Sequence, residues 1–148
     1  MGQITFNPIG PNVAFSPVGG SGPVQSPTAT EPFLPAVSFY VQEGNTAAIG
    51  CAFTDEAGNP VIPTAINWSL SDDEGNIRNY RHDVPFSGTL AQAITIVLNS
   101  LDTTRMVFDD LMMILKVAFT YNSLAGNGNG LQGVGQYRFG LIASAVET

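Results

Sequence analysis

The side chains best suited to catalysis are few. His82 is the only histidine, Asp83 follows it and Ser87 lies close in sequence, so a Ser-His-Asp arrangement could be drawn from these three. No nucleophile elbow or glycine-rich oxyanion loop accompanies them, and closeness in sequence does not make a triad. We therefore interpret His82 as a surface-loop residue and expect that the protein is not an enzyme.

The single cysteine and the acidic turns are the remaining candidates for site chemistry. Cys51 lies on the apolar face of a predicted strand, which is typical of a small buried hydrophobe, and one cysteine with one histidine cannot complete a zinc site. The acids of residues 72–76, with Asp109 and Asp110, gather oxygen ligands, but their spacing departs from the EF-hand pattern. We predict no metal and no cofactor, with calcium at these acids as the less favoured alternative.

Charge and hydropathy limit the kind of partner. The 148 residues include 12 acidic and 5 basic side chains, which give a formal net charge of −7, and only 11% of the residues are charged. This balance disfavours a nucleic-acid footprint or a polybasic membrane patch. No apolar run approaches the ~20 residues of a membrane-spanning helix, and residues 1–6 lack the features of a secretory signal. We expect a soluble protein that binds neither nucleic acid nor membrane.

The N-terminal region differs in composition from the rest of the chain. Residues 1–30 contain no Asp, Glu, Lys or Arg, and seven of the ten prolines lie between Pro8 and Pro35. Proline removes backbone donors and favours extended geometry in the residue before it. The composition therefore predicts an extended, Pro/Gly-rich arm over residues 1–35, followed by a folded domain over residues 36–148.

The arm contains a short repeat. Residues 4–10 and 13–19 share the pattern apolar, small, Phe, Asn or Ser, Pro, apolar, Gly. Its apolar side chains would lie in water in an idle tail, so we favour a segment that docks on other subunits over a disordered tail. The predicted partner-binding residues are Ile4, Phe6, Pro8, Ile9, Val13, Phe15, Pro17 and Val18.

The folded domain shows the pattern of an all-β protein. Residues 46–54 and 64–71 alternate between apolar and polar or small side chains, and the second stretch places Trp68 inward. Residues 111–121 fit a helix or a strand, and the β-branched and aromatic residues at their end favour a strand. Further strands are expected at residues 37–41, 77–82, 89–98 and 132–143, with a mobile hairpin tip at residues 126–130. Short strands with turns about every ten residues predict a β-sandwich.

One segment carries a resemblance to a known family. Residues 54–72, TDEAGNPVIPTAINWSLSD, place a polar Gly-Asn-Pro turn before a strand that contains Trp68, and an acidic Gly-Asn turn comes next at residues 73–77. This segment resembles the strand, turn and Trp-strand of immunoglobulin-like domains in tailed-bacteriophage virion proteins. The likeness extends more loosely through Leu90 to Leu101, covers roughly residues 37–143 and implies an immunoglobulin-like β-sandwich. Cys51 departs from the antibody pattern, because it has no second cysteine with which to form the inter-sheet disulfide.

The resemblance and the arm together lead to a functional expectation. They imply an accessory structural protein of a bacteriophage particle, made in the host cytoplasm and located in the virion, as a head decoration or a head–tail or tail component. Its arm would dock on neighbouring capsid, portal or tail subunits, and we expect a homo-oligomer in the particle. The alternative is a virion-displayed module that binds a carbohydrate or a host receptor. Its polar contacts would come from Tyr80, Arg81, His82 and residues 127–129.

Overall fold

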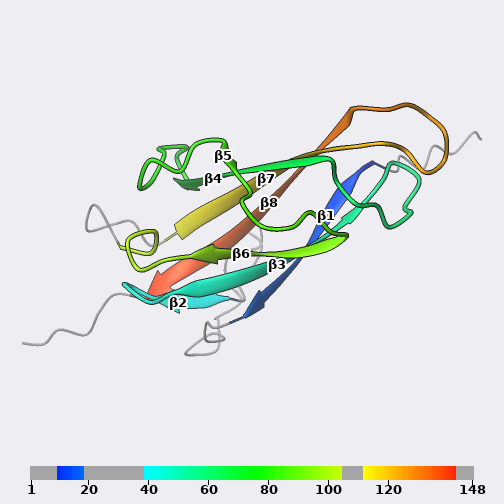
Figure 1. Ribbon diagram of the computed structural model, residues 1–148. Coiled ribbons are helices and arrows are strands. Elements are labelled where there is room, and N and C mark those ends of the chain that lie inside the picture. Colours follow the sequence, from blue (N-terminus) through cyan, green and yellow to red (C-terminus); the bar gives the residue numbers. More distant parts are fainter. Residues whose placement is uncertain (1–9, 19–38, 105–111, 143–148) are drawn as a thin grey trace, which may run out of the picture.

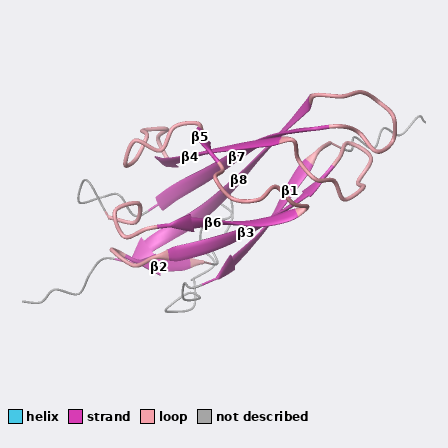
Figure 2. Cartoon of the chain, in the orientation of Figure 1, coloured by secondary structure: helices cyan, strands magenta, loops and turns pink. Residues whose placement is uncertain are grey.

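The computed structural model describes residues 10–18, 39–104 and 112–142, and within these residues the protein is all-β, without a helix (Figures 1 and 2). The strands are β1 (Asn12–Val18), β2 (Tyr40–Gln42), β3 (Ala47–Thr54), β4 (Ala65–Asp72), β5 (Val84–Pro85), β6 (Ala93–Leu98), β7 (Met112–Tyr121) and β8 (Leu131–Ile142). They form a three-stranded sheet in the order β1-β3-β6 and a five-stranded sheet in the order β2-β8-β7-β4-β5. The two sheets are consistent with the predicted β-sandwich.

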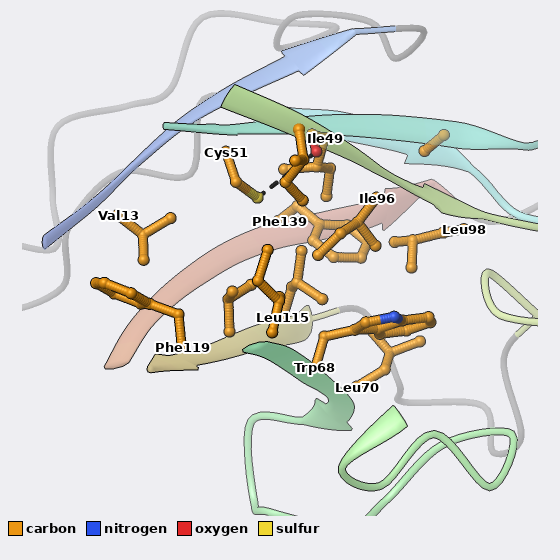
Figure 3. Packing of buried hydrophobic residues seen from close by; sticks show 14 of the residues in the cluster. Val13, Ile49, Cys51, Trp68, Leu70, Ile96, Leu98, Leu115, Phe119 and Phe139 are labelled. Carbon is orange, nitrogen blue, oxygen red and sulfur yellow. Dashed lines mark hydrogen bonds between the residues drawn. The ribbon is translucent and has the colours of Figure 1, made fainter. Parts of the chain in front are cut away.

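Alternation along the strands builds one core between the sheets (Figure 3). Every second residue of β3 and of β7 is buried, and the partners between them are half-buried or exposed. The Phe53 and Phe119 rings, from opposite sheets, lie with their centroids 4.8 Å apart. Trp68 is buried as predicted, and residues 112–121 are confirmed as a strand. Each large apolar side chain buried in this way contributes about 1.5–3 kcal/mol before chain entropy is subtracted.

The longest pairing is the β7–β8 hairpin. It runs antiparallel from Met112↔Gly140 to Tyr121↔Leu131, which confirms the predicted terminal hairpin. β4 pairs antiparallel with the other side of β7, and β2 pairs parallel with the end of β8. The loops that come after β4 and β7 lie at opposite ends of the molecule (Figure 1).

Part of the predicted arm is a strand of the folded body. Residues 12–18 form β1, which pairs antiparallel with β3. Val13 is buried in the core, and the half-buried Phe15 stacks on Tyr137 with ring centroids 5.3 Å apart. Period-two alternation of apolar residues therefore decides the structure of this stretch in spite of Pro17, because proline is tolerated in an edge strand. Residues 1–9 and 19–35 of the predicted arm lie outside the described residues.

Two glycines of β8 make room for β1. A Cβ atom on Gly135 would lie 2.8 Å from Cβ of Val13, and one on Gly133 would lie 2.8 Å from Cβ of Pro11. Real Cβ atoms do not approach other carbons this closely, so a side chain at Gly135 would push β1 away from β8. A side chain at Gly133 would also press on the Phe119 ring, whose nearest atom would lie 2.5 Å from the added Cβ. The absence of side chains at the two glycines of the Gly-Val-Gly sequence thus allows this part of the chain to pack closely on β8.

Other predicted strands are shorter or absent. β6 begins at Ala93 rather than near residue 89, and β2 covers Tyr40–Gln42, whereas residues 37 and 38 of the predicted strand lie outside the described residues. Residues 77–82, predicted as a strand, form a loop in which only Ile77 makes a bridge, to Ser71. This loop contains residues with positive φ, which a regular strand cannot accommodate.

Candidate binding site

The candidate site lies at one end of the molecule and begins with the turn after β4. Oδ1 of Asp72 accepts hydrogen bonds from the backbone N–H groups of Glu74 (2.9 Å) and Asn76 (2.8 Å). Oδ2 accepts from Nδ2 of Asn76 (3.0 Å) and from Nη2 of Arg78 (2.8 Å). Gly75, with φ of 91°, supplies the left-handed residue that the turn requires. The Asp72 carboxylate therefore fixes its own turn and, through Arg78, the start of the loop that follows.

The surroundings of Asp72 favour its charged form. Burial raises the pKa of this carboxyl, but the hydrogen bonds from Asn76 and Glu74 and the positive charge of Arg78 outweigh it, so the pKa lies below its ordinary value. The Asp72 carboxylate is thus ionised at neutral pH and accepts four hydrogen bonds from its own turn and from Arg78.

A second buried carboxylate holds the middle of the loop. Asp102 is fully buried and accepts hydrogen bonds from Nδ2 of Asn79 (2.7 Å), from Nε and Nη2 of Arg81 (2.8 and 3.3 Å) and from the backbone N–H of Asn99 (2.9 Å). Its hydrogen bonds and charge raise the pKa of Arg81. The Arg81 guanidinium also lies 5.3 Å from the ring centre of Trp68, a cation–π arrangement. Arg81 is therefore committed to the protein's own structure.

The backbone of this loop is held in a strained conformation. Leu70 donates from its N–H to the carbonyl of Arg81 and accepts at its own carbonyl from the N–H of Arg78, both at 2.9 Å. Between these contacts, Asn79 and Tyr80 have φ values of 51° and 58°. A tyrosine rarely adopts such a φ, and residues held in this region cluster at functional sites.

The strained loop displays Tyr80 to solvent. Its side chain is 96% exposed, the highest value among the exposed large hydrophobic residues of the described chain. Beside it lies a cleft of about 400 Å³ lined by Ile77, Arg78, Asn79, Tyr80, Leu101 and Thr104. Leu101 and Ile77 are themselves 66% and 41% exposed, so the cleft offers apolar surface next to polar groups. Tyrosine in such a setting is a typical anchor for a macromolecular partner.

The polar contacts predicted for a receptor-binding module are not brought together. Tyr80 and His82 are exposed at this end of the molecule, whereas Arg81 is bound to Asp102. Residues 127–129 lie at the opposite end, in the β7–β8 loop drawn in orange in Figure 1. There, Nδ2 of Asn127 donates to Oε2 of Glu56 at 2.6 Å.

The glycine-rich loop at that opposite end, predicted as a mobile tip, is fastened by two acids. Glu56 accepts hydrogen bonds from the Tyr121 hydroxyl (2.9 Å) and the Ser123 hydroxyl (2.6 Å) in addition to Asn127. Asp55 accepts from the backbone N–H of Leu124 at 3.1 Å. The hydrogen bonds from Ser123, Asn127 and Tyr121 lower the pKa of Glu56 despite its partial desolvation. This loop is thus tied to the turn after β3.

The residues considered for catalysis are not assembled into a site. The His82 side chain is two-thirds exposed, its Nε2 lies 3.4 Å from Oδ2 of Asp83, and no hydrogen bond joins it to Ser87 in the part of the chain that the structure describes. Cys51 is buried as predicted, and burial raises the pKa of its thiol to about 12. Across residues 10–18, 39–104 and 112–142, no group of three or more His, Cys, Asp or Glu side chains is arranged to hold a metal ion.

The predicted partner-binding residues divide into two sets. Val13 is buried in the core and Phe15 and Pro17 are half-buried, so these side chains pack on their own domain, and the backbone of Val18 pairs with Ala48. The other four lie outside the described residues: Ile4, Phe6, Pro8 and Ile9. Conversely, sequence reasoning missed Leu101 and Asp102. The Asn99-Ser-Leu-Asp102 turn after a strand was the available signal.

No protein-family model matches the sequence, and the search of curated proteins returned no match. Within the described residues there is no helix of the length and apolarity needed to cross a membrane.

Proposed function

We propose that this chain is an accessory structural protein of a bacteriophage particle, a head decoration or a head–tail or tail component, with no catalytic role. The assignment to a virion rests on the resemblance of residues 54–72 to the turn and Trp-strand of phage immunoglobulin-like domains. The described structure supports this interpretation at one point: β4 carries Trp68 into the core between two polar turns of closely similar geometry.

We further infer that the sandwich is immunoglobulin-like. In such folds, strands B and E lie in one sheet, and strands C, F and G in the other. The order here is compatible with that scheme if β3 and β6 correspond to B and E, and β4, β7 and β8 to C, F and G. β1 and β2, which pair with β3 and β8, then correspond to a first strand divided between the two sheets.

The single observation that carries the docking role is the exposure of Tyr80 on a rigid loop. Two buried carboxylates, Asp72 and Asp102, hold this loop before any partner arrives, so binding would require little loss of conformational entropy. The flanking Ile77 and Leu101 enlarge the apolar surface that a partner would cover. We propose that this end contacts a neighbouring virion protein, and that Ile4, Phe6, Pro8 and Ile9 add a second contact.

Incorporation into particles tests this proposal. Phage carrying Tyr80→Ala should contain at least about tenfold fewer copies of the protein per particle, since truncation of a central tyrosine commonly costs about 2 kcal/mol or more of binding energy and about 1.4 kcal/mol already weakens binding tenfold. Copies per particle are measured by quantitative mass spectrometry of purified virions. His82→Ala, an exposed neighbour on the same loop, is the matched control. Normal incorporation of Tyr80→Ala would refute docking through this loop, and absence of the wild-type protein from virions would refute the structural role itself.

The alternative, a displayed module that binds a carbohydrate or host receptor, is favoured by the same exposed tyrosine. An aromatic ring beside the polar side chains of Arg78 and Asn79 suits the stacking and hydrogen bonding of a sugar. Glycan-array binding by the purified protein that is lost in Tyr80→Ala, together with normal incorporation of that variant, would select this function.

A further inference from the structure

The three-stranded sheet has two edges, and their strands differ. β1 forms one edge and β6 the other. An edge strand presents backbone N–H and C=O groups that can pair with another chain, and proteins commonly block such edges with proline or with charged side chains. Whether each free side is blocked can be read from the register.

The register shows which groups of β6 face its free side. The N–H of Phe53 donates to the carbonyl of Gln92 at 3.0 Å, so the backbone groups of Phe53 face β6, and the register continues without interruption along β6. Bonded and non-bonded pairs alternate in an antiparallel ladder. The N–H and C=O groups of Ala93, Thr95 and Val97 therefore point away from β3.

The same alternation shows that proline interrupts the free side of β1. Pro17 lies opposite Ile49, whose backbone groups face β6, so Pro17 occupies a non-bonded pair. Its missing N–H falls on the free side of β1, where proline is tolerated and removes a donor that another strand could use. Val13 and Phe15 occupy equivalent positions and keep their N–H groups, so Pro17 makes β1 a poorer edge for pairing than β6 without closing it.

β6 has no such protection. Its sequence, AITIVL, contains neither proline nor a charged residue, and within the described residues no other strand pairs with its free side. Ala93, Thr95 and Val97 are exposed, whereas the intervening Ile94 and Ile96 are buried. The backbone N–H and C=O groups that remain open are therefore those that take no part in the pairing of β6 with β3.

We propose that β6 is a self-association site, at which a second copy of this chain pairs antiparallel across a two-fold axis at Thr95. In this register Thr95 lies opposite Thr95 of the second copy, and Ala93 lies opposite its Val97. All of these are hydrogen-bonded pairs, because the backbone groups of the three residues face the free side. The pairing joins the two three-stranded sheets into one continuous sheet.

The charge distribution favours a second copy over an acidic or basic partner. The chain carries a net charge of −7, so two copies repel each other over most approaches. β1, β3 and β6 contain no charged residue, so the three-stranded sheet lets like-charged copies meet without bringing acids together. An uncharged strand buried in this way also loses no ionic hydration. This inference is independent of the proposed role in a virion.

A charge exchange at the axis tests the proposal with the purified full chain. Wild-type protein should show a monomer–dimer equilibrium in sedimentation velocity, up to twice the 15.6 kDa of one chain. Thr95→Lys and Thr95→Glu should each be monomeric, because like charges would face each other across the axis. An equimolar mixture of the two variants should recover the dimer, and added salt should weaken it. A mixture that stays monomeric, or a wild type that is monomeric at every concentration, would overturn the proposal.

Proline supplies a second, independent arm of the test. Thr95→Pro removes a donor from the free side only and should weaken association at least about tenfold, with Thr95→Val as the control that keeps the N–H. Hydrogen exchange should show the amides of Ala93, Thr95 and Val97 protected in the dimer and fast in the monomer. Protection of these amides in a monomer would mean that the chain covers its own edge, which would also overturn the proposal.

Discussion

The two ends of the molecule are built on the same turn and differ in what the turn holds. Asp55 and Asp72 each accept the backbone N–H groups of the residues two and four positions later at 2.8–2.9 Å, and each is bound by the side-chain amide of the asparagine four positions later. Gly58 and Gly75 occupy the same left-handed position, with φ of 85° and 91°. The sequence pattern Asp-x-x-Gly-Asn thus gives one local structure twice.

The partners of the two turns give the two ends different properties. At the Asp55 end, Glu56 and Asp55 accept hydrogen bonds from the loop between β7 and β8, so the polar groups are satisfied within the chain. At the Asp72 end, Asp102 fixes a loop that turns Tyr80 outward into solvent. A fixed loop with an exposed aromatic side chain is typical of a binding surface, whereas a self-satisfied network is typical of structure. The proposed recognition role therefore falls on the Asp72 end.

The largest effect is expected from Asp102→Ala. This change leaves Arg81 without its carboxylate and the N–H of Asn99 without its acceptor, and the loss of one partner of a buried ion pair is strongly destabilising. We expect the free energy of unfolding to fall by about 2–3 kcal/mol, with part of the penalty relieved because Arg81 reaches solvent. Urea denaturation measures it. Asp73→Ala, at an exposed acid of the same end, is the control and should change stability little. Equal effects of the two changes would contradict the assigned role of Asp102.

The next effect lies toward the other end, where β1 begins. Gly135→Ala would place a Cβ 2.8 Å from Cβ of Val13, so β1 must move or strain. We expect a loss of about 1–3 kcal/mol in the free energy of unfolding, as is usual when a packed interior is overfilled. Gln136→Ala, at an exposed neighbour, should be close to neutral. A neutral Gly135→Ala would mean that β1 is not held against β8.

Acid should weaken both ends together. Hydrogen bonds lower the pKa of Asp55 and Asp72 against the opposing effect of burial, and they lower the pKa of Glu56. Because these folded-state pKa values lie below the unfolded ones, the stabilisation is complete above about pH 4–5 and is lost as the pH falls through the folded-state values. The urea midpoint measured against pH should therefore decline in acid.

Single replacements separate the two ends in that profile. Asp72→Asn and Asp55→Asn should each lower the midpoint at neutral pH and make its decline in acid shallower, because one titrating group is removed. The two replaced aspartates differ in one respect. Within the described residues, Asp72 also forms an ion pair, with Arg78, whereas Asp55 forms none. If neither variant changed the acid slope, the lowered pKa values would be contradicted.

Much of the fold could be predicted from the sequence because it depends on local alternation. The strands around Ile49 and Trp68, the turn at Asp72 and the burial of Cys51 all follow from side-chain period and turn chemistry. The sequence predicts an arm in place of β1, because the prolines and glycines around it outweigh the alternation of Val13 and Phe15. Its pairing with β3 and its close packing against Gly135 of the other sheet depend on residues that lie far along the chain, Gly135 more than a hundred residues later.

The candidate site is harder to predict for the same reason. The turn at residues 72–76 suggests that a strand follows over residues 77–82, and nothing near Tyr80 in sequence indicates a left-handed backbone at a tyrosine. Asp102, which imposes this conformation through Asn79 and Arg81, comes more than twenty residues after them. Long-range partners of this kind leave no local pattern.

The smallest effect is expected from Tyr80→Gly. This change tests whether the backbone conformation of Tyr80, proposed to serve binding, lowers the free energy of unfolding. Glycine adopts a φ of 58° without steric cost, whereas the same φ costs tyrosine about 1 kcal/mol. Relief of this strain should raise the free energy of unfolding by up to that amount. The greater freedom of glycine in the unfolded chain offsets part of the gain. The exposed ring makes little packing contact that could be lost, because it is 96% accessible. The same variant should be depleted from particles as strongly as Tyr80→Ala. Stability that rises or holds while incorporation falls is the signature of a residue kept for binding, whereas a fall in both would place Tyr80 in the structure of the loop and remove the distinction between the two ends.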